Sequence, residues 1–183
     1  MSNLLNSHDL PMGQVRTGND TEADGQLQTM LGAEAWVENV NWGASNPITK
    51  IDRRHFRIRL TRNVVGSAIV PRRQVDYGTT ASNWGINVDG YTGDNETGNG
   101  IVDPFLPTAG AADDEIFNLV VAGPVDVENT ADGAIAVGDF IVSAASGQVN
   151  EQTAAPANET AVMQQVKSFV GRAEEAAAAS AER

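Results

Sequence analysis

Residues 133–149 constrain the fold of this chain more than any other segment. They read GAIAVGDFIVSAASGQV, so that short apolar runs alternate with Gly, Asp and Ser, the residues that favour turns. The segment contains no arrangement of residues typical of catalysis. Turn signals every few residues, between short apolar runs, predict a β-sandwich or a small barrel.

The composition of the whole chain agrees with this prediction. Its 183 residues, 41% of them hydrophobic and 20% charged, are enough for one domain with a sizeable core. The 18 Gly and 7 Pro residues favour short strands joined by irregular loops over a helical bundle. We therefore predict a mainly β, single-domain protein.

The clearest predicted strand is His55–Arg62. Its apolar residues Phe56, Ile58 and Leu60 occupy alternate positions, the period-two pattern of a half-buried strand. Residues 33–42 favour a first strand, although a helix is also compatible with them. Further apolar runs predict strands over Val64–Val70, Ile116–Val121, Val125–Glu128, Ile135–Val137, Phe140–Ser143 and Gln148–Asn150.

Two long segments lack apolar periodicity. Residues 1–30 are polar, and we predict that they form an extended N-terminal arm. Residues 78–110 contain seven Gly, two Pro and four acidic residues and predict a long Gly-rich loop. Because structureless loops of that length are uncommon in a compact domain, this segment either lies along a partner or contains short strands without a visible pattern.

Residues 133–149, together with the later segment 170–180 (VGRAEEAAAAS), resemble a known pattern. The small β-rich head decoration, or cement, proteins of tailed bacteriophages often carry G-x-I-x-x-G-D-x-V-x-x-x-x-G-x-V followed by V-G-x-A-x-E-A-A-A. The similarity covers about the last third of the chain. It implies a structural protein on the outer surface of an icosahedral head, made in the host cytoplasm, that clamps neighbouring major capsid subunits and forms a homotrimer.

The C-terminal region permits two interpretations. Residues 161–180 contain strong helix formers, with Asn158 as a possible N-cap. The resemblance instead implies a last strand at about Val166–Glu174, and Gly171 supports a break in any helix. We favour the strand, so that the β-rich domain spans 31–175 and a short Ala-rich tail follows at 176–183.

The charges are distributed unevenly. The net charge is −12, yet residues 50–73 carry eight basic residues and one acid (+7), which leaves four basic and 23 acidic residues elsewhere (−19). A solvated strand face and a protein contact are both compatible with this cluster, and the acidic chain makes nucleic acid a less favoured partner. As candidate contacts with the capsid or with another copy of the chain we take Arg53, Arg54, Arg57, Arg59, Arg62, Arg72 and Arg73.

Signals for other chemistry are weak. The chain has no Cys, and His8 and His55 are isolated, so we predict no metal site, no cofactor and no enzyme activity. No run of about 18 apolar residues occurs, so we expect no membrane span. The acids of the Gly-rich loop lack the spacing of an EF-hand and favour a solvated acidic loop: Asp89, Asp94, Glu96 and Asp103.

Two alternative functions stay open. A phage tail or fibre component is the nearest structural alternative. A carboxylate-dependent carbohydrate hydrolase is the more distant alternative, because nothing singles out a pair among the 24 acidic residues.

Overall fold

The computed structural model describes residues 10, 12–17, 30–38, 55–94, 96–130, 133–152, 158–167, 169–173 and 176–177. The fold is mainly β, as the sequence predicts, and the described strands do not close into a barrel. Within these residues, the helical elements are the short 3₁₀ turns η1 (Ala81–Asn83) and η2 (Ala145–Gly147) and the α-helix α2 (Glu159–Lys167). The strands are β1 (Arg16–Thr17), β2 (Glu34–Glu38), β3 (His55–Asn63), β4 (Gln74–Asp76), β5 (Asn87–Val88), β6 (Gly90–Tyr91), β7 (Gly100–Val102), β8 (Glu115–Ala122), β9 (Phe140–Ser143), β10 (Val149–Glu151) and β11 (Phe169–Arg172).

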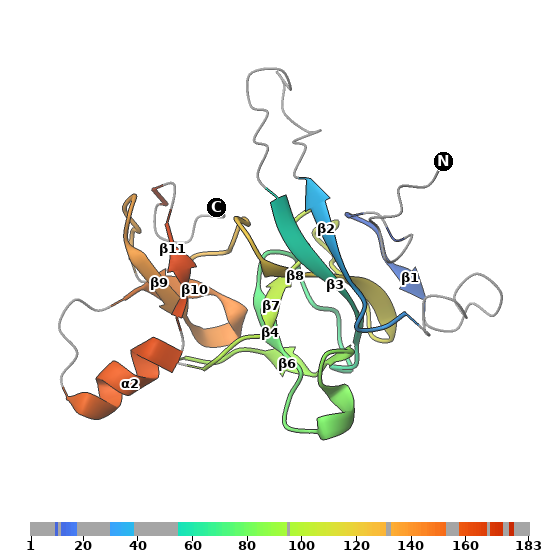
Figure 1. The fold of residues 1–183 in the computed structure, drawn as a ribbon, viewed down its shortest axis with the longest axis horizontal. Helices are drawn as coiled ribbons and strands as arrows, with labels where there is room; N and C mark the ends of the chain where they lie inside the picture. Colours follow the sequence, from blue (N-terminus) through green and yellow to red (C-terminus); the bar gives the residue numbers. More distant parts are fainter. Residues whose placement is uncertain are drawn as a thin grey trace, which may run out of the picture.

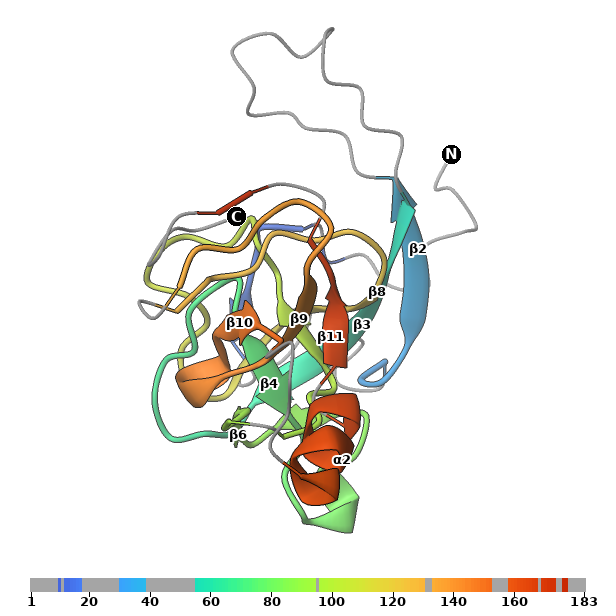
Figure 2. The ribbon, with the colours of Figure 1, turned by 90° about the vertical axis from the view of Figure 1, so that its left-hand side faces the viewer.

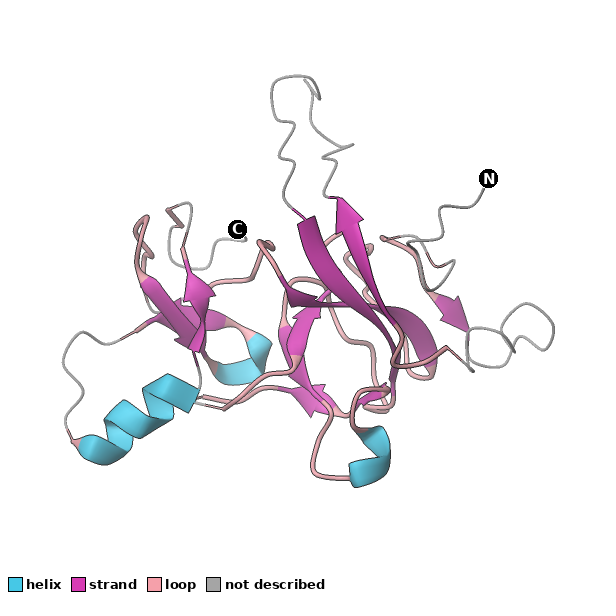
Figure 3. Cartoon of the chain, in the orientation of Figure 1, coloured by secondary structure: helices cyan, strands magenta, loops and turns pink. Residues whose placement is uncertain are grey.

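These strands form two sheets that lie beside each other (Figure 1). The larger sheet has the order β2-β3-β8-β7-β4-β6, with β1 paired to β8 and β5 paired to β3. The smaller sheet has the order β10-β9-β11, and α2 lies at the start of β11 (Figures 2 and 3). We call β9, β10, β11, η2 and α2 the C-terminal lobe.

The antiparallel pair β3–β8 forms the centre of the larger sheet. Its register runs from Arg62 opposite Ile116 to Arg57 opposite Ala122, with one irregularity between Arg57 and Ile58. These two strands confirm the predictions over 55–62 and 116–121. Residues 33–42 contribute β2, which pairs with the other edge of β3.

Both faces of this central pair are buried. Phe117 and Leu119 project from one face into a core with Val75, Val88 and Val102. The alternate residues of the two strands project from the other face, where they pack in two further clusters that include Ile58 with Val120 and Leu60 with Ile116.

The expectation of a half-buried strand at 55–62 is therefore wrong toward its C-terminal end. Thr61 and Asn63 are fully buried as well. Their polar groups are satisfied by backbone carbonyls: Thr61 donates to Ile86, and the Asn63 amide donates to Ser67, Ala111 and Ala112.

The Gly-rich segment 78–110 contains β5, β6, β7 and η1. The alternative that it holds short strands is thus the correct one. Strands of two or three residues are too short to show a period-two pattern, which is why the sequence does not reveal them.

Three predicted strands are wrong. Val64–Val70, Val125–Glu128 and Ile135–Val137 form no strand; the first and third hold single β-bridges at Ile69 and Ile135, and a further bridge forms at Asn129. The strands predicted at Phe140–Ser143 and Gln148–Asn150 are confirmed as β9 and, one residue later, β10.

The C-terminal region contains both of the structures that the sequence permits. The Asn158 side chain accepts a hydrogen bond from the backbone N–H of Ala161 (2.9 Å), so it caps α2. The helix continues through Lys167, so the strand predicted to begin at Val166 starts later, as β11 at Phe169. The tail 178–183 lies outside the described residues.

Much of the predicted N-terminal arm lies outside the described residues, but the described part contacts the larger sheet. The Asn118 amide donates to the Leu10 carbonyl (3.0 Å), and β1 pairs with the first residues of β8. The fully buried carboxylate of Asp103 accepts hydrogen bonds from the backbone N–H groups of Gly13 (2.7 Å) and Phe105 (2.9 Å). Asp103 therefore ties the N-terminal segment to the loop after β7.

We expect Asp103 to make stability depend on pH. Burial raises its pKa from 3.8 to about 6, although the hydrogen bonds from Gly13 and Phe105 oppose the shift. The folded protein therefore holds a proton that the unfolded chain has lost between these values. The contribution of Asp103 to stability is complete below pH 3.8 and decreases as the pH rises through 6.

Urea unfolding at pH 4 and pH 7 measures this effect. Relative to Asp103→Asn, the unsubstituted protein should lose on the order of 2–3 kcal/mol of unfolding free energy between the two conditions. The matched control is Asp113→Asn, at an exposed carboxylate that also accepts a backbone N–H. If the unsubstituted protein and the Asp103→Asn variant differ by the same free energy at both pH values, the prediction is contradicted.

Candidate functional site

The acidic residues singled out in the Gly-rich loop do not converge on a metal or a substrate. Glu96 accepts a hydrogen bond from the Gly93 N–H, Asp89 accepts one from Asn83 at 3.4 Å, and Asp103 is buried as described. Among the described residues, no group of three or more His, Cys, Asp and Glu side chains could hold a metal ion.

Many other carboxylates have the same role of closing loops. Asp76, Glu115 and Asp139 each accept a hydrogen bond from a backbone N–H two or three residues away. Asp113 accepts one from the N–H of Gly66, which lies in a different loop. The acidic composition therefore serves the irregular loops that the Gly and Pro content predicts. Within the described part of the chain no helix is long and apolar enough to cross a membrane.

The predicted arginine contacts do not form one basic surface. Arg53 and Arg54 lie outside the described residues. Arg62 lies 3.6 Å from Asp114, Arg59 pairs with Glu34, and Arg73 pairs with Glu128. Arg72 occupies the turn before β4 with a positive φ of 65°. Among the described residues, Arg59, Arg62 and Arg73 thus pair with three different carboxylates of the same chain.

Arg59 is held inside the larger sheet. Its guanidinium donates to the Glu34 carboxylate from Nε (2.9 Å) and from Nη2, and it donates to the Tyr77 hydroxyl from Nη1 (3.0 Å). Burial opposes the charge on Arg59, but the hydrogen bonds with Glu34 and Tyr77 outweigh it, so the pKa lies above its ordinary value. Burial raises the pKa of Tyr77, while Arg59 acts in the opposite direction.

Arg57 differs from Arg59, although both project from the same face of β3. Its side chain is 41% exposed, and its Nε lies 3.3 Å from a Glu34 oxygen. Trp36 lies directly opposite Arg57 in the β2–β3 ladder and is 59% exposed. Trp36, Arg57 and Glu34 form what we call the hairpin face, an aromatic ring and a partly exposed guanidinium side by side.

The hairpin face has the properties of a protein contact. Large aromatic side chains are usually buried, and Trp and Arg are the residues most enriched among those that dominate binding energy. Of the candidate residues from the sequence, the structure thus keeps Arg57 at an exposed surface, and it adds Trp36 beside it. Sequence patterns missed Trp36 as a surface residue because a Trp in an apolar run is usually part of the core.

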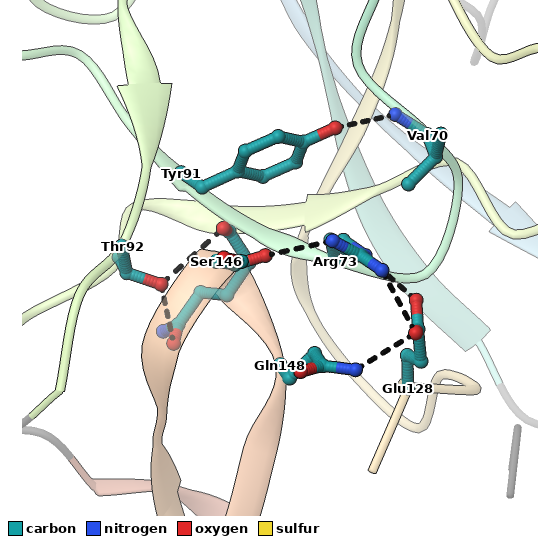
Figure 4. A network of polar contacts seen from close by, with 8 residues as sticks. Val70, Arg73, Tyr91, Thr92, Glu128, Ser146 and Gln148 are labelled. Carbon is teal, nitrogen blue, oxygen red and sulfur yellow. Dashed lines mark hydrogen bonds and ion pairs between the residues drawn. The ribbon is translucent and has the colours of Figure 1, made fainter. Parts of the chain in front are cut away.

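Arg73 instead lies at the junction of the two sheets (Figure 4). It donates to both Glu128 oxygens, from Nε (2.7 Å) and from Nη2 (2.8 Å), and its guanidinium carbon lies 5.6 Å from the Tyr91 ring centroid. Gln148 donates to the same carboxylate (2.8 Å), and Arg73 Nη1 donates to the Ser146 carbonyl (3.4 Å). These bonds connect the start of β4 with η2 and β10.

Close backbone packing reinforces this junction. The Gly147 N–H donates to the Thr92 carbonyl (2.8 Å). Gly147 has a φ of 74°, and a Cβ placed there would lie 2.3 Å from the Gln74 carbonyl oxygen. Only glycine fits, so the C-terminal lobe is held against the larger sheet by both ionic and steric complementarity.

A second exposed surface lies on the C-terminal lobe. Val162, Met163 and Val166 on α2 are exposed, as are Phe140 and Phe169 on β9 and β11. We call these five residues the apolar face. Their spacing was visible in the sequence, but an apolar helix face normally indicates core, and the described residues leave this one uncovered.

We expect Arg57 and Arg59 to differ in their effect on stability. Arg59→Ser removes charge-assisted bonds to Glu34 and the donor to Tyr77, and should lower the free energy of unfolding by about 2 kcal/mol. Arg57→Ser removes an exposed ion pair and should cost less than about 0.5 kcal/mol. Chemical denaturation of both variants tests this, and equal losses would show that Arg57 also packs the domain.

We expect Arg73 and Glu128 to be energetically coupled. The hydrogen bond from Arg73 lowers the pKa of Glu128, so the contribution of the pair is present above the ordinary value of 4.5 and is lost as the pH falls through the lower folded value. A double-mutant cycle with Arg73→Met and Glu128→Gln should give a coupling of about 2 kcal/mol at pH 7 that shrinks in acid. A coupling near zero at pH 7 would contradict this role.

Comparisons with known proteins give little further information. No protein-family model and no curated protein matches the chain. Among solved structures, the chain has a likeness to the crystal structure of the head fiber gp8.5 N base in bacteriophage phi29, with 15% sequence identity and a TM-score of 0.41, over 68% of this chain and 87% of that chain. A likeness of this degree does not establish a shared fold.

Proposed function

We propose that this chain is a structural protein of a tailed bacteriophage that binds the outer surface of the icosahedral head and holds neighbouring major capsid subunits together. The partner is inferred from the resemblance of residues 133–149 and 170–180 to head decoration proteins. A tail or fibre component is the alternative within the same class of structural proteins.

The observation that carries the binding role is the hairpin face. Trp36 and Arg57 lie opposite each other on β2 and β3, and each leaves a large part of its side chain in water. Against an acidic partner surface, Arg57 supplies a guanidinium fork for carboxylates, and Trp36 supplies apolar area at a small entropic cost. Glu34 holds Arg57 near its observed position before binding.

The scaffold suits this role because its strands and loops are tied together internally. Asp103 and the Arg73–Glu128 pair fix segments that lie far apart in the sequence. A binding surface on a rigid scaffold loses little conformational entropy on association. Weak contacts repeated over many sites on a symmetrical head can then hold each copy firmly.

Cosedimentation with undecorated heads tests the proposal. The purified chain should bind heads, and Trp36→Ala and Arg57→Ser should weaken binding by about 30-fold and about tenfold. Arg16→Ser is the matched control, since Arg16 is an exposed arginine on β1. Binding through Arg57 should also weaken as salt is added.

Three outcomes would reject the proposal or part of it. If the heads gain no mass when they are mixed with the purified chain, capsid binding is rejected. Variants at Trp36 and Arg57 that bind as well as the Arg16→Ser control would reject the hairpin face. Negative-stain labelling of virions that marks the tail instead of the head would support the fibre or tail alternative.

A further inference from the structure

The apolar face of the C-terminal lobe is large enough for a protein interface. Its side chains are well exposed: Val162 by 43%, Met163 by 55%, Val166 by 64%, Phe140 by 53% and Phe169 by 49%. Together they present on the order of 500 Å² of apolar surface, which is near the upper end for a single patch on a monomer. It is also close to the apolar share of a standard interface, in which each partner buries about 800 Å².

The two phenylalanine rings and helix α2 lie close to each other in the C-terminal lobe. The rings of Phe140 and Phe169 pack edge to face with centroids 5.8 Å apart. Gln152 joins the helix to this pair, because its N–H donates to the Phe140 carbonyl (2.8 Å) and its side chain donates to Gln165 on α2 (3.2 Å). Figures 1 and 2 both show α2 near β11, and Phe169, two residues after the helix, is the first residue of that strand.

The charges bordering this surface match a second copy of the same helix. Helix α2 begins at Glu159 and ends at Lys167, so that Met163 is its middle residue. At 3.6 residues per turn, Glu159, Val162, Met163 and Val166 lie within about 100° of arc on one side of the helix. An antiparallel copy centred on Met163 would therefore place Glu159 of each helix against Lys167 of the other.

Basic side chains border this surface although the chain as a whole is acidic. Arg172 lies 6.0 Å from the Phe140 ring centroid, and Lys167 ends the helix, so both accompany the acidic Glu159. The whole chain carries −12, and copies of it repel one another over most of their surfaces. Next to the apolar face, in contrast, Lys167 and Arg172 add two positive charges beside the one negative charge of Glu159.

We propose that this surface is an isologous interface through which two copies of the chain associate, with their α2 helices antiparallel. Met163 packs against its counterpart at the two-fold axis, and Phe140 and Phe169 extend the contact over the smaller sheet. The association is a two-fold pair, unlike the homotrimer that the sequence resemblance implies. It requires no capsid and goes beyond the proposed function.

Sedimentation velocity of the full chain over a range of micromolar concentrations tests the proposal. The unsubstituted protein should sediment as a dimer, and Val166→Glu should raise its dissociation constant by about 100-fold. Trp84→Glu is the matched control, because Trp84 is another exposed apolar residue, outside this face. The melting temperatures of both variants show whether each folds.

Charge reversal tests the antiparallel arrangement separately. Glu159→Lys and Lys167→Glu should each weaken the dimer by roughly tenfold, and the double variant should restore it. Glu151→Lys, at an exposed acid on β10, controls for the change in net charge. A double variant that regains the dimer must be folded. Such a result would therefore show that the single variants weaken the dimer through repulsion and not through unfolding.

A monomer or a trimer of the unsubstituted chain overturns the proposal, as does a dimer that Val166→Glu leaves intact. A dimer that the double charge reversal fails to restore overturns the antiparallel arrangement. Because no heads are present in these experiments, their failure would leave the proposed capsid binding standing, and the cosedimentation test decides that function by itself.

Discussion

The antiparallel pairing of β3 with β8 is the constraint on which the rest of the structure depends. Along most of their length the two strands are buried on both faces, so the chain must supply a cover for each side. One cover comes from β4 and the strands of the Gly-rich segment, and the other includes the N-terminal residues near Leu10 and the apolar residues after β8. Segments that are distant in the sequence converge on the β3–β8 pair because they cover its two faces.

Polar residues in the central strands make this convergence specific. Asn63 and Asn118 are fully buried, and each donates to carbonyls of a covering segment, Asn63 to Ala111 and Asn118 to Leu10. A buried amide without a partner costs about 1–3 kcal/mol, so these bonds favour one arrangement of the covers over others. Arg59, Arg73 and Asp103 act in the same way, because each forms hydrogen bonds with the backbone or a carboxylate of another segment.

In the part of the chain that the structure describes, this internal use of charge contrasts with two exposed surfaces. The acidic residues that cap loops and the arginines that pair within the chain are occupied, whereas Trp36 and Arg57 on the hairpin and the apolar side chains on the C-terminal lobe remain exposed. The two surfaces lie on different sheets. A protein that binds a partner through the hairpin face and a second copy of itself through the apolar face would combine attachment to the partner with self-association.

The sequence by itself determined the β-rich class, because turn residues at short intervals allow only short strands. It also determined the strand at 55–62, which shows a period-two pattern, and the strands at 116–121 and 140–143, which are apolar runs between turn residues. The order of strands, the short pairings in 78–110 and the partner of each arginine were decided only by the tertiary structure. A run of basic residues in a sequence looks the same whether its charges face water or acids brought from far along the chain, as Glu34 and Glu128 are brought to Arg59 and Arg73.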